Sequence, residues 1–208
     1  MTETTGSPTL EPFPDGQRIF APDPAKSYLA TRFADHARYA PALIVYLLAL
    51  AELPEHRAQY GRHLGGTKLY DPGSWTEPAG RFLDQRALAF YRRASGREGG
   101  RIVRGWANVY TAGDYIVPHS HTEADMSVVY MLDPGEEDAA EPTSGRFCFA
   151  DPRWALCCQV EPGRLSNTIA PPMQAGAMLI FPAEAVHFVH PYLGRRPRLT
   201  LSWNIRHG

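Results

Sequence analysis

Cysteine is scarce in this chain of 208 residues, and the three cysteines present form no pattern. Cys148 stands alone and Cys157 is adjacent to Cys158, so neither a disulfide framework nor a CxxC zinc site follows. An excess of charge of one sign is also missing, because 21 basic residues face 22 acidic ones and the formal net charge is −1. This balance disfavours a nucleic-acid partner.

Long apolar runs are missing as well. The most apolar stretch, residues 42–53, is too short to span a bilayer. The first residues are polar, acidic and rich in proline, without the basic start and apolar run of a signal peptide. We therefore expect no membrane association and a location in the reducing cytoplasm. The composition does not define the oligomeric state and leaves a homodimer open.

Hydrophobic residues make up 44% of the chain, which is typical of a globular protein. A chain of this length can bury roughly 70% of the surface that it exposes when unfolded. We expect one compact domain in three parts. Residues 1–20 are a flexible lead, residues 21–100 a helical support, and residues 101–208 a β-rich core.

Three helices are predicted in the helical support. Asp23 and Pro24 are typical of an N-cap followed by proline in the first turn, and the apolar pattern then continues to Phe33. Residues 42–53 predict a second, buried helix that ends before a proline. Residues 74–77 read Ser-Trp-Thr-Glu, a capping box that predicts the start of a third helix.

From about residue 101 the pattern changes to short β-rich runs separated by turn residues. Such a pattern is typical of an antiparallel sandwich, barrel or jelly roll. The predicted strands are residues 102–110, 126–132, 146–149, 177–181, 186–189 and 198–205.

Two histidines in this part have the spacing of metal ligands. His119 and His121 are two positions apart, so in an extended strand both imidazoles point to the same face. An isolated His-x-His is more often a pair of surface histidines, but His187 follows later at the end of another β-rich run. A second register is open, because residues 121–123 read His-Thr-Glu and offer Glu123 as a ligand.

The last predicted strand alternates between polar and apolar side chains. Arg198, Thr200 and Asn204 face one way, whereas Leu199 and Trp203 face the other. A strand of this kind suits the wall of a hydrated pocket.

In their order along the chain, these segments resemble the iron(II)/2-oxoglutarate-dependent oxygenases. The resemblance is closest to a small bacterial and phage group with the pattern HxH…SGVYYL…FPxxxxHxVxP…RxSxSFN, and it covers about residues 104–205. The chain departs from the pattern in three places. Val128 replaces a glycine, residues 183–185 read Ala-Glu-Ala in place of Ser-Trp-Leu, and Thr200 replaces a serine.

The resemblance implies a mainly β fold. Its core is a double-stranded β-helix, a cupin-like jelly roll, with the N-terminal α-helices packed outside. It also implies an enzyme with Fe(II), 2-oxoglutarate and O₂ as cofactor and co-substrates. The activity that we expect is hydroxylation of a small molecule, such as an amino acid or a natural-product intermediate, with formation of succinate and CO₂.

The resemblance also assigns roles to residues. The metal ligands are His119, His121 and His187, with Glu123 as the alternative ligand. The residues expected to bind 2-oxoglutarate are Arg198, Thr200, Tyr130, Asn108 and Tyr110. The residues expected to contact the substrate are Arg153, Trp106 and Asn204. Arginine suits the far carboxylate of the co-substrate because its planar guanidinium binds a carboxylate with two parallel hydrogen bonds.

Two other functions remain open from the sequence. A true three-histidine site would also suit a cupin-type dioxygenase that uses no 2-oxoglutarate, although Arg198 followed by Thr200 argues against it. The second alternative is a protein that binds a metal or a small ligand without catalysis.

Overall fold

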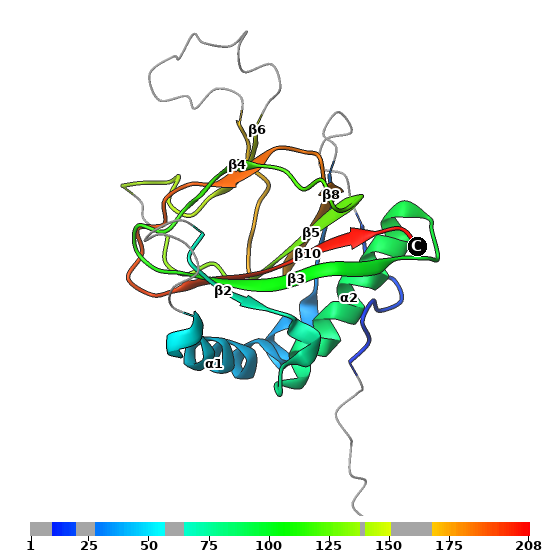
Figure 1. The fold of residues 1–208 in the computed structure, drawn as a ribbon, viewed down its shortest axis with the longest axis horizontal. Helices are drawn as coiled ribbons and strands as arrows, with labels where there is room; N and C mark the ends of the chain where they lie inside the picture. The colour runs from blue at the N-terminus through cyan, green and yellow to red at the C-terminus, as the bar shows by residue number, and fades with distance from the viewer. Residues whose placement is uncertain (1–9, 20–27, 57–64, 138–139, 151–167) are drawn as a thin grey trace, which may run out of the picture.

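The computed structural model describes residues 10–19, 28–56, 65–137, 140–150 and 168–208. Within these residues, two antiparallel β-sheets face each other, and two α-helices cover the outer face of the larger sheet (Figure 1). This arrangement confirms the predicted double-stranded β-helix with helices outside.

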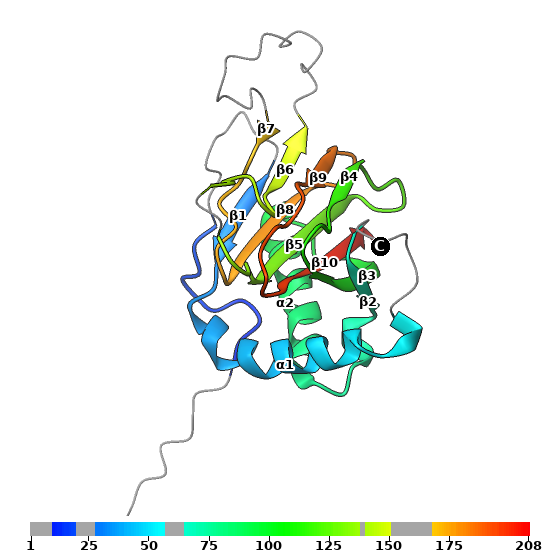
Figure 2. The ribbon, with the colours of Figure 1, turned by 90° about the vertical axis from the view of Figure 1, so that its left-hand side faces the viewer.

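The larger sheet has six strands in the order β1-β8-β5-β10-β3-β2. Its strands are β1 (Leu29–Arg32), β8 (Ala177–Pro182), β5 (Met126–Asp133), β10 (Arg198–Arg206), β3 (Arg101–Tyr110) and β2 (Thr67–Tyr70). The smaller sheet has four strands in the order β4-β9-β6-β7. These are β4 (Ile116–His119), β9 (His187–Val189), β6 (Phe147–Ala150) and β7 (Thr168–Ile169). Figure 2 shows the strands of both sheets running nearly alongside one another.

Two of these strands correct the expectation of a purely helical support over residues 21–100. Leu29–Arg32, predicted as part of a first helix, is strand β1 and pairs with β8, with Leu29 opposite Ile180. Thr67–Tyr70 is strand β2 and pairs with β3. Pairing with a distant strand overrides the local helical pattern here, because local propensity is weak compared with tertiary packing. Asp23 and Pro24 lie outside the described residues.

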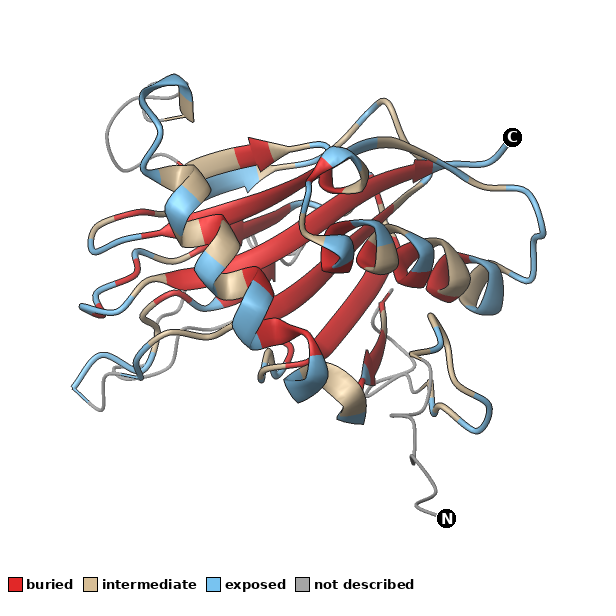
Figure 3. Ribbon diagram, turned by 90° about the horizontal axis from the view of Figure 1, so that it is seen from below, coloured by how far each residue is buried: buried red, intermediate tan, exposed pale blue. Residues whose placement is uncertain are grey.

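The helices α1 (Ala40–Ala51) and α2 (Pro78–Ser95) lie across the outer face of the larger sheet (Figure 3). Short 3₁₀ turns are η1 (Ala34–Arg38), η2 (Pro54–His56) and η3 (Pro72–Ser74). The capping box at residues 74–77 predicted Ser74 as the N-cap of α2. That prediction is wrong, because Ser74 belongs to η3. The N-cap of α2 is Glu77, whose carboxylate accepts a hydrogen bond from the backbone N–H of Ala79.

The core between helices and sheet explains why both helices form. Leu43 and Leu47 of α1 and Leu83 of α2 are fully buried against residues such as Leu69 and Trp203 of the sheet. Each buried aliphatic or aromatic side chain contributes about 1.5–3 kcal/mol of transfer free energy. Packing of these faces therefore stabilises the helices and holds the larger sheet in place beneath the site. No helix in the described part of the chain is long and apolar enough to cross a membrane.

A buried ion pair joins α2 to the start of the helical layer. The guanidinium of Arg86 is fully buried and donates to both carboxylate oxygens of Asp35, at 2.9 and 2.6 Å. It also donates to the hydroxyl of Tyr39, at 2.9 Å, which in turn contacts the hydroxyl of Tyr130. The imidazole of His36 lies 2.6 Å from the same Tyr130 hydroxyl.

We expect Arg86→Met to destabilise the protein by about 3–5 kcal/mol, because removal of one partner leaves the other polar groups of a buried network without their cation. The melting temperature should fall by roughly 6–20 °C for a chain of this size. Arg81→Met is the matched control, because Arg81 is exposed on the same helix. An equal effect of both variants in thermal unfolding would contradict the importance of the ion pair.

Candidate metal centre

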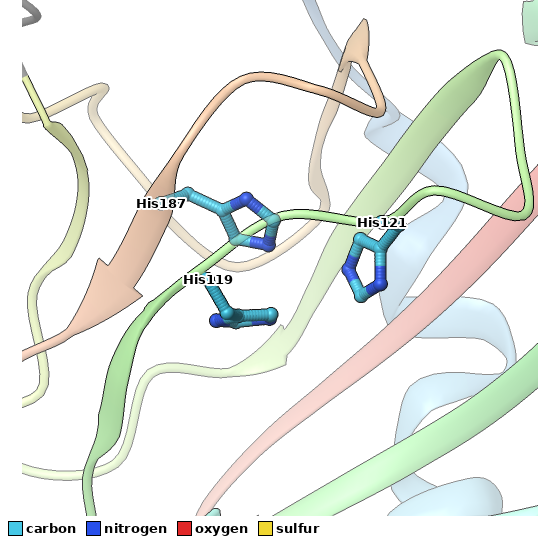
Figure 4. Close-up of side chains that lie close together, drawn as sticks. All are labelled: His119, His121 and His187. Carbon is cyan, nitrogen blue, oxygen red and sulfur yellow. The ribbon is translucent and has the colours of Figure 1, made fainter.

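Three histidines from the smaller sheet and its adjoining loop converge at the space between the two sheets. His119 ends β4, His121 follows two residues later, and His187 begins β9 directly opposite His119. One ring nitrogen from each histidine lies within 4.8 Å of the others, and Figure 4 shows the three rings gathered around a common point. The structure thus brings together the three histidines that the sequence predicted as metal ligands.

Backbone carbonyls orient two of the three rings. The Nδ1 atom of His119 lies 2.9 Å from the carbonyl oxygen of Val117, and Nδ1 of His187 lies 2.8 Å from that of Ala185. A carbonyl oxygen can only accept a hydrogen bond, so Nδ1 carries the proton in both rings. Nε2 is then left with a free lone pair, as a metal ligand requires.

Burial keeps the rings neutral. Burial and the neighbouring His119 lower the pKa of His187 to about 3, and the same two causes lower the pKa of His121 to about 4. Burial also lowers the pKa of His119. At neutral pH all three rings are therefore uncharged and available to bind a cation.

The alternative ligand Glu123 lies outside this group of three. Its Oε1 atom accepts a hydrogen bond of 2.7 Å from Nδ2 of Asn204 and lies 3.9 Å from Nδ1 of His121. Its side chain is 41% exposed. Asn204 is fully buried and also accepts a hydrogen bond from the hydroxyl of Ser127. Asn204, predicted to contact substrate, thus bonds to Glu123, which lies beside His121.

A small inner cavity borders both the histidines and β10. Its lining includes His119, His187, Arg198 and Thr200. Arg198 is almost completely buried, and its Nη1 atom has no hydrogen-bond partner in the structure. An arginine stays protonated even though burial lowers its pKa, so this guanidinium is a buried positive charge that faces a cavity.

The neighbours of Arg198 hold it in place without neutralising it. Its guanidinium lies 4.9 Å from the ring centroid of Tyr110, its register partner on β3. Burial raises the pKa of the Tyr110 hydroxyl to about 12, so Tyr110 brings no negative charge. Gly145 has a φ of +61°, and a Cβ there would lie 3.0 Å from Cδ of Arg198. Only glycine allows the backbone to pass this close to the arginine.

A hydrogen bond joins the side chains of Thr200 and Asn108. Nδ2 of Asn108 donates to the hydroxyl of Thr200 at 3.2 Å, and Oδ1 of Asn108 accepts from Nζ of Lys68 at 3.1 Å. Both residues line the inner cavity, as the sequence predicted. Lys68 was not predicted. It enters the site because β2 pairs with β3 so that Lys68 lies opposite Asn108.

A second, outer cavity lies on the other side of the histidines. It has a volume of about 230 Å³, and His119 and His121 line it together with Lys68, Arg104 and Trp106. Trp106, predicted to contact substrate, lines both cavities. Its ring packs edge to face against that of His121, with 5.9 Å between the ring centroids. The metal centre therefore borders two adjoining cavities that share part of their lining.

One residue predicted to bind 2-oxoglutarate lies away from the centre. Tyr130 points to the helical side of the larger sheet, where its hydroxyl contacts Tyr39 and His36, so its predicted contact with 2-oxoglutarate is wrong. Along β5 the side chains alternate, and Val129 rather than Tyr130 lines the cavity. Arg153 lies outside the described residues.

The residues present fit the cofactors of one class of enzyme. Three neutral imidazoles can hold a divalent iron and leave other coordination positions open, and a buried arginine across the cavity can bind a carboxylate. The class that this fold and site define is that of the non-haem iron oxygenases with a 2-oxo acid co-substrate.

The comparison with protein families reaches the same result. Residues 104–204, just under half of the chain, match the family described as "Putative 2OG-Fe(II) oxygenase". This match indicates a 2-oxoglutarate-dependent non-haem iron oxygenase, whose cofactor and co-substrates are Fe(II), 2-oxoglutarate and O₂. No curated protein matches the sequence.

Solved structures with the same fold are distant in sequence. The non-heme alpha ketoglutarate dependent epimerase SnoN from nogalamycin biosynthesis is 17% identical, with 87% of this chain and 78% of that chain covered and a TM-score of 0.62. HygX from Streptomyces hygroscopicus, solved with nickel and 2-oxoglutarate, is 13% identical, with 87% of this chain and 82% of that chain covered and a TM-score of 0.60. A Pseudomonas putida prolyl-4-hydroxylase is 22% identical, with 86% of this chain and 93% of that chain covered and a TM-score of 0.56.

Proposed function

We propose that this oxygenase hydroxylates a small molecule, such as an amino acid or a natural-product intermediate, in the cytoplasm. In this proposal His119, His121 and His187 hold Fe(II), and Arg198 binds the far carboxylate of 2-oxoglutarate. The observation that carries the proposal is the buried, unpartnered Nη1 of Arg198, which borders the same cavity as two of the histidines. The pair of Arg198 and Thr200 on one strand argues against a cupin-type enzyme without 2-oxoglutarate.

When bound, Fe(II) would supply the coupling of O₂ reduction to decarboxylation of 2-oxoglutarate, which yields succinate and CO₂. The residues of the chain do the remaining work. The Arg198 guanidinium orients the co-substrate, and the Thr200 hydroxyl can donate to the same carboxylate because it lies two residues along the same strand face. Val129, Phe147 and Val189 line the same cavity with apolar surface and exclude water.

The size of the outer cavity supports a small substrate. Its volume of about 230 Å³ lies just under the range of about 300–1,000 Å³ that is typical of small-molecule sites. Among the proteins with the same fold, SnoN and the carbocyclase SnoK belong to nogalamycin biosynthesis, and another is a prolyl-4-hydroxylase. These activities support oxidation of a small molecule or of a single residue.

Anaerobic titration of the metal-free protein with Fe(II) and then 2-oxoglutarate tests the proposal. We expect a weak visible charge-transfer band to appear with 2-oxoglutarate, because the keto acid binds the metal through two oxygens. Succinate, which lacks the keto group, is the control and should give no band. Binding of Fe(II) without a band would favour the three-histidine enzyme without 2-oxoglutarate, and absence of iron binding would reject the metal site.

A further inference from the structure

The outer cavity carries positive charge that the binding of iron and 2-oxoglutarate does not use. Lys68 and Arg104 line it beside His119 and His121, and none of the described residues that line it is a carboxylate. The wall that this cavity shares with the inner one consists of Lys68, Trp106, Ile116 and His119. A ligand here would therefore meet two cations next to the metal centre.

Lys68 is a half-buried cation without an acidic partner in the described part of the chain. Its Nζ atom donates to Oδ1 of Asn108 at 3.1 Å and lies 5.4 Å from the ring centroid of Trp106. Burial and the nearby Arg104 lower the pKa of Lys68 to about 8, so the ammonium is still mainly protonated at neutral pH. Partial burial of such a charge is unfavourable unless an anion compensates it.

The contrast with other cations of the protein supports this interpretation. Arg86 and Arg196 each bind a carboxylate of the chain, Asp35 and Asp133 respectively. Among the described residues, Lys68 donates only to a neutral amide oxygen. Its positive charge is therefore available to a ligand.

The other groups at this cavity complement Lys68. Arg104, Trp106 and Asn108 are alternate residues of β3 and so share one face of the strand. Arg104 is exposed and stands where the cavity meets solvent. Nε1 of Trp106 is buried and has no hydrogen-bond partner among the described residues. Two cations at a single cavity form a binding site for an anion.

We propose that the outer cavity binds the substrate to be oxidised and that this substrate is a small anion, a carboxylate or a phosphate ester, held by Lys68 and Arg104. The inference rests on the proposed function and adds the chemical class of the substrate. It assigns separate cations to the two ligands, Arg198 to the co-substrate and Lys68 with Arg104 to the substrate.

Calorimetric titration of the protein loaded with Ni(II) and saturating 2-oxoglutarate tests the inference without turnover. The probes are benzoate, phenyl phosphate and the neutral benzamide. Saturating 2-oxoglutarate occupies Arg198, so an anionic probe can report only on the remaining cations. We expect at least one anionic probe to bind more tightly than benzamide, and the tighter of the two identifies the anion as carboxylate or phosphate.

Variants assign the binding to the residues. Lys68→Met and Arg104→Gln should each weaken the anionic probe at least tenfold and leave benzamide unchanged, whereas Lys68→Arg should retain most of the affinity. Arg101→Gln removes a charge from the exposed start of β3, outside the cavity, and is the matched control. Affinity for the anion should also fall as salt concentration rises.

The inference would be overturned if the anionic probes bound no more tightly than benzamide, or if Lys68→Met bound the anionic probe as the wild type does. It would also be overturned if Lys68→Met weakened the binding of 2-oxoglutarate and left the binding of the probe unchanged. The last result would assign Lys68 to the co-substrate. Failure of the proposed function is distinguishable, because 2-oxoglutarate would then give no charge-transfer band with the Fe(II)-loaded protein.

Discussion

Arg198→Gln is expected to weaken 2-oxoglutarate binding by roughly 30- to 3,000-fold, because loss of one partner of a buried charge pair costs about 2–5 kcal/mol. Nη1 of Arg198 is buried at the inner cavity without a partner among the described residues, and glutamine is shorter and uncharged but keeps a polar amide. Fe(II) binding should stay within about threefold, since Arg198 is not in the histidine cluster. Titration of the charge-transfer band with 2-oxoglutarate measures the first effect, and iron binding by calorimetry measures the second.

Two further variants define the role of this arginine. Arg198→Lys keeps the charge without the planar fork and should bind 2-oxoglutarate more weakly than the wild type and more tightly than Arg198→Gln. Arg206→Gln removes a charge from the exposed end of the same strand and should have no effect. If Arg198→Gln bound 2-oxoglutarate as the wild type does, the assignment of the co-substrate site would be wrong.

His187→Ala is expected to weaken Fe(II) binding by more than about 100-fold, since loss of a residue that only supports a ligand already costs 10- to 100-fold. His187 is buried, and its Nδ1 is occupied by the carbonyl of Ala185, so Nε2 is its free ligand atom. The charge-transfer band with 2-oxoglutarate should disappear with the metal. His190→Gln is the control, because His190 follows on the same segment and is not in the histidine cluster.

The same measurement distinguishes the two ligand registers. If the three histidines hold the metal, His119→Ala should match the loss in His187→Ala, and Glu123→Gln should reduce affinity by about tenfold, the low end of the range for a residue that only supports a ligand. In the second register, with His121, Glu123 and His187 as ligands, Glu123→Gln would match the loss in His187→Ala and His119→Ala would retain most of the affinity. Retention of tight iron binding in both His187→Ala and His121→Ala would reject the metal site as a whole.

The β-rich half of the fold was predictable because its signal is local. The alternation along residues 198–205 correctly predicted a strand with Arg198 and Thr200 facing a cavity. The spacing of His119 and His121, together with His187, correctly predicted three side chains that meet. In these segments the two-residue period of a strand decides which side chains share a face.

The errors come from features that depend on distant partners. Tyr130 was assigned to the site from its position in a motif, but the sequence of β5 is apolar on both faces and does not show which face is inside. Lys68 carries no motif, and it reaches the centre only because β2 pairs with β3. Leu29–Arg32 pairs with a strand about 150 residues further along the chain, so no local pattern marks it as a strand.

The two strands from the N-terminal part have a consequence for the solubility of the larger sheet. In the order of its six strands, β1 and β2 occupy the two ends, next to β8 and β3. A fragment limited to residues 101–208 would expose the backbone N–H and C=O groups of both β8 and β3, which are templates for intermolecular pairing. Each terminal strand has only four residues, and short edge strands offer little length for association with another chain. The N-terminal part thus covers both edges of the larger sheet with short strands, which disfavours aggregation. It does so although it supplies little of the chemistry of the site.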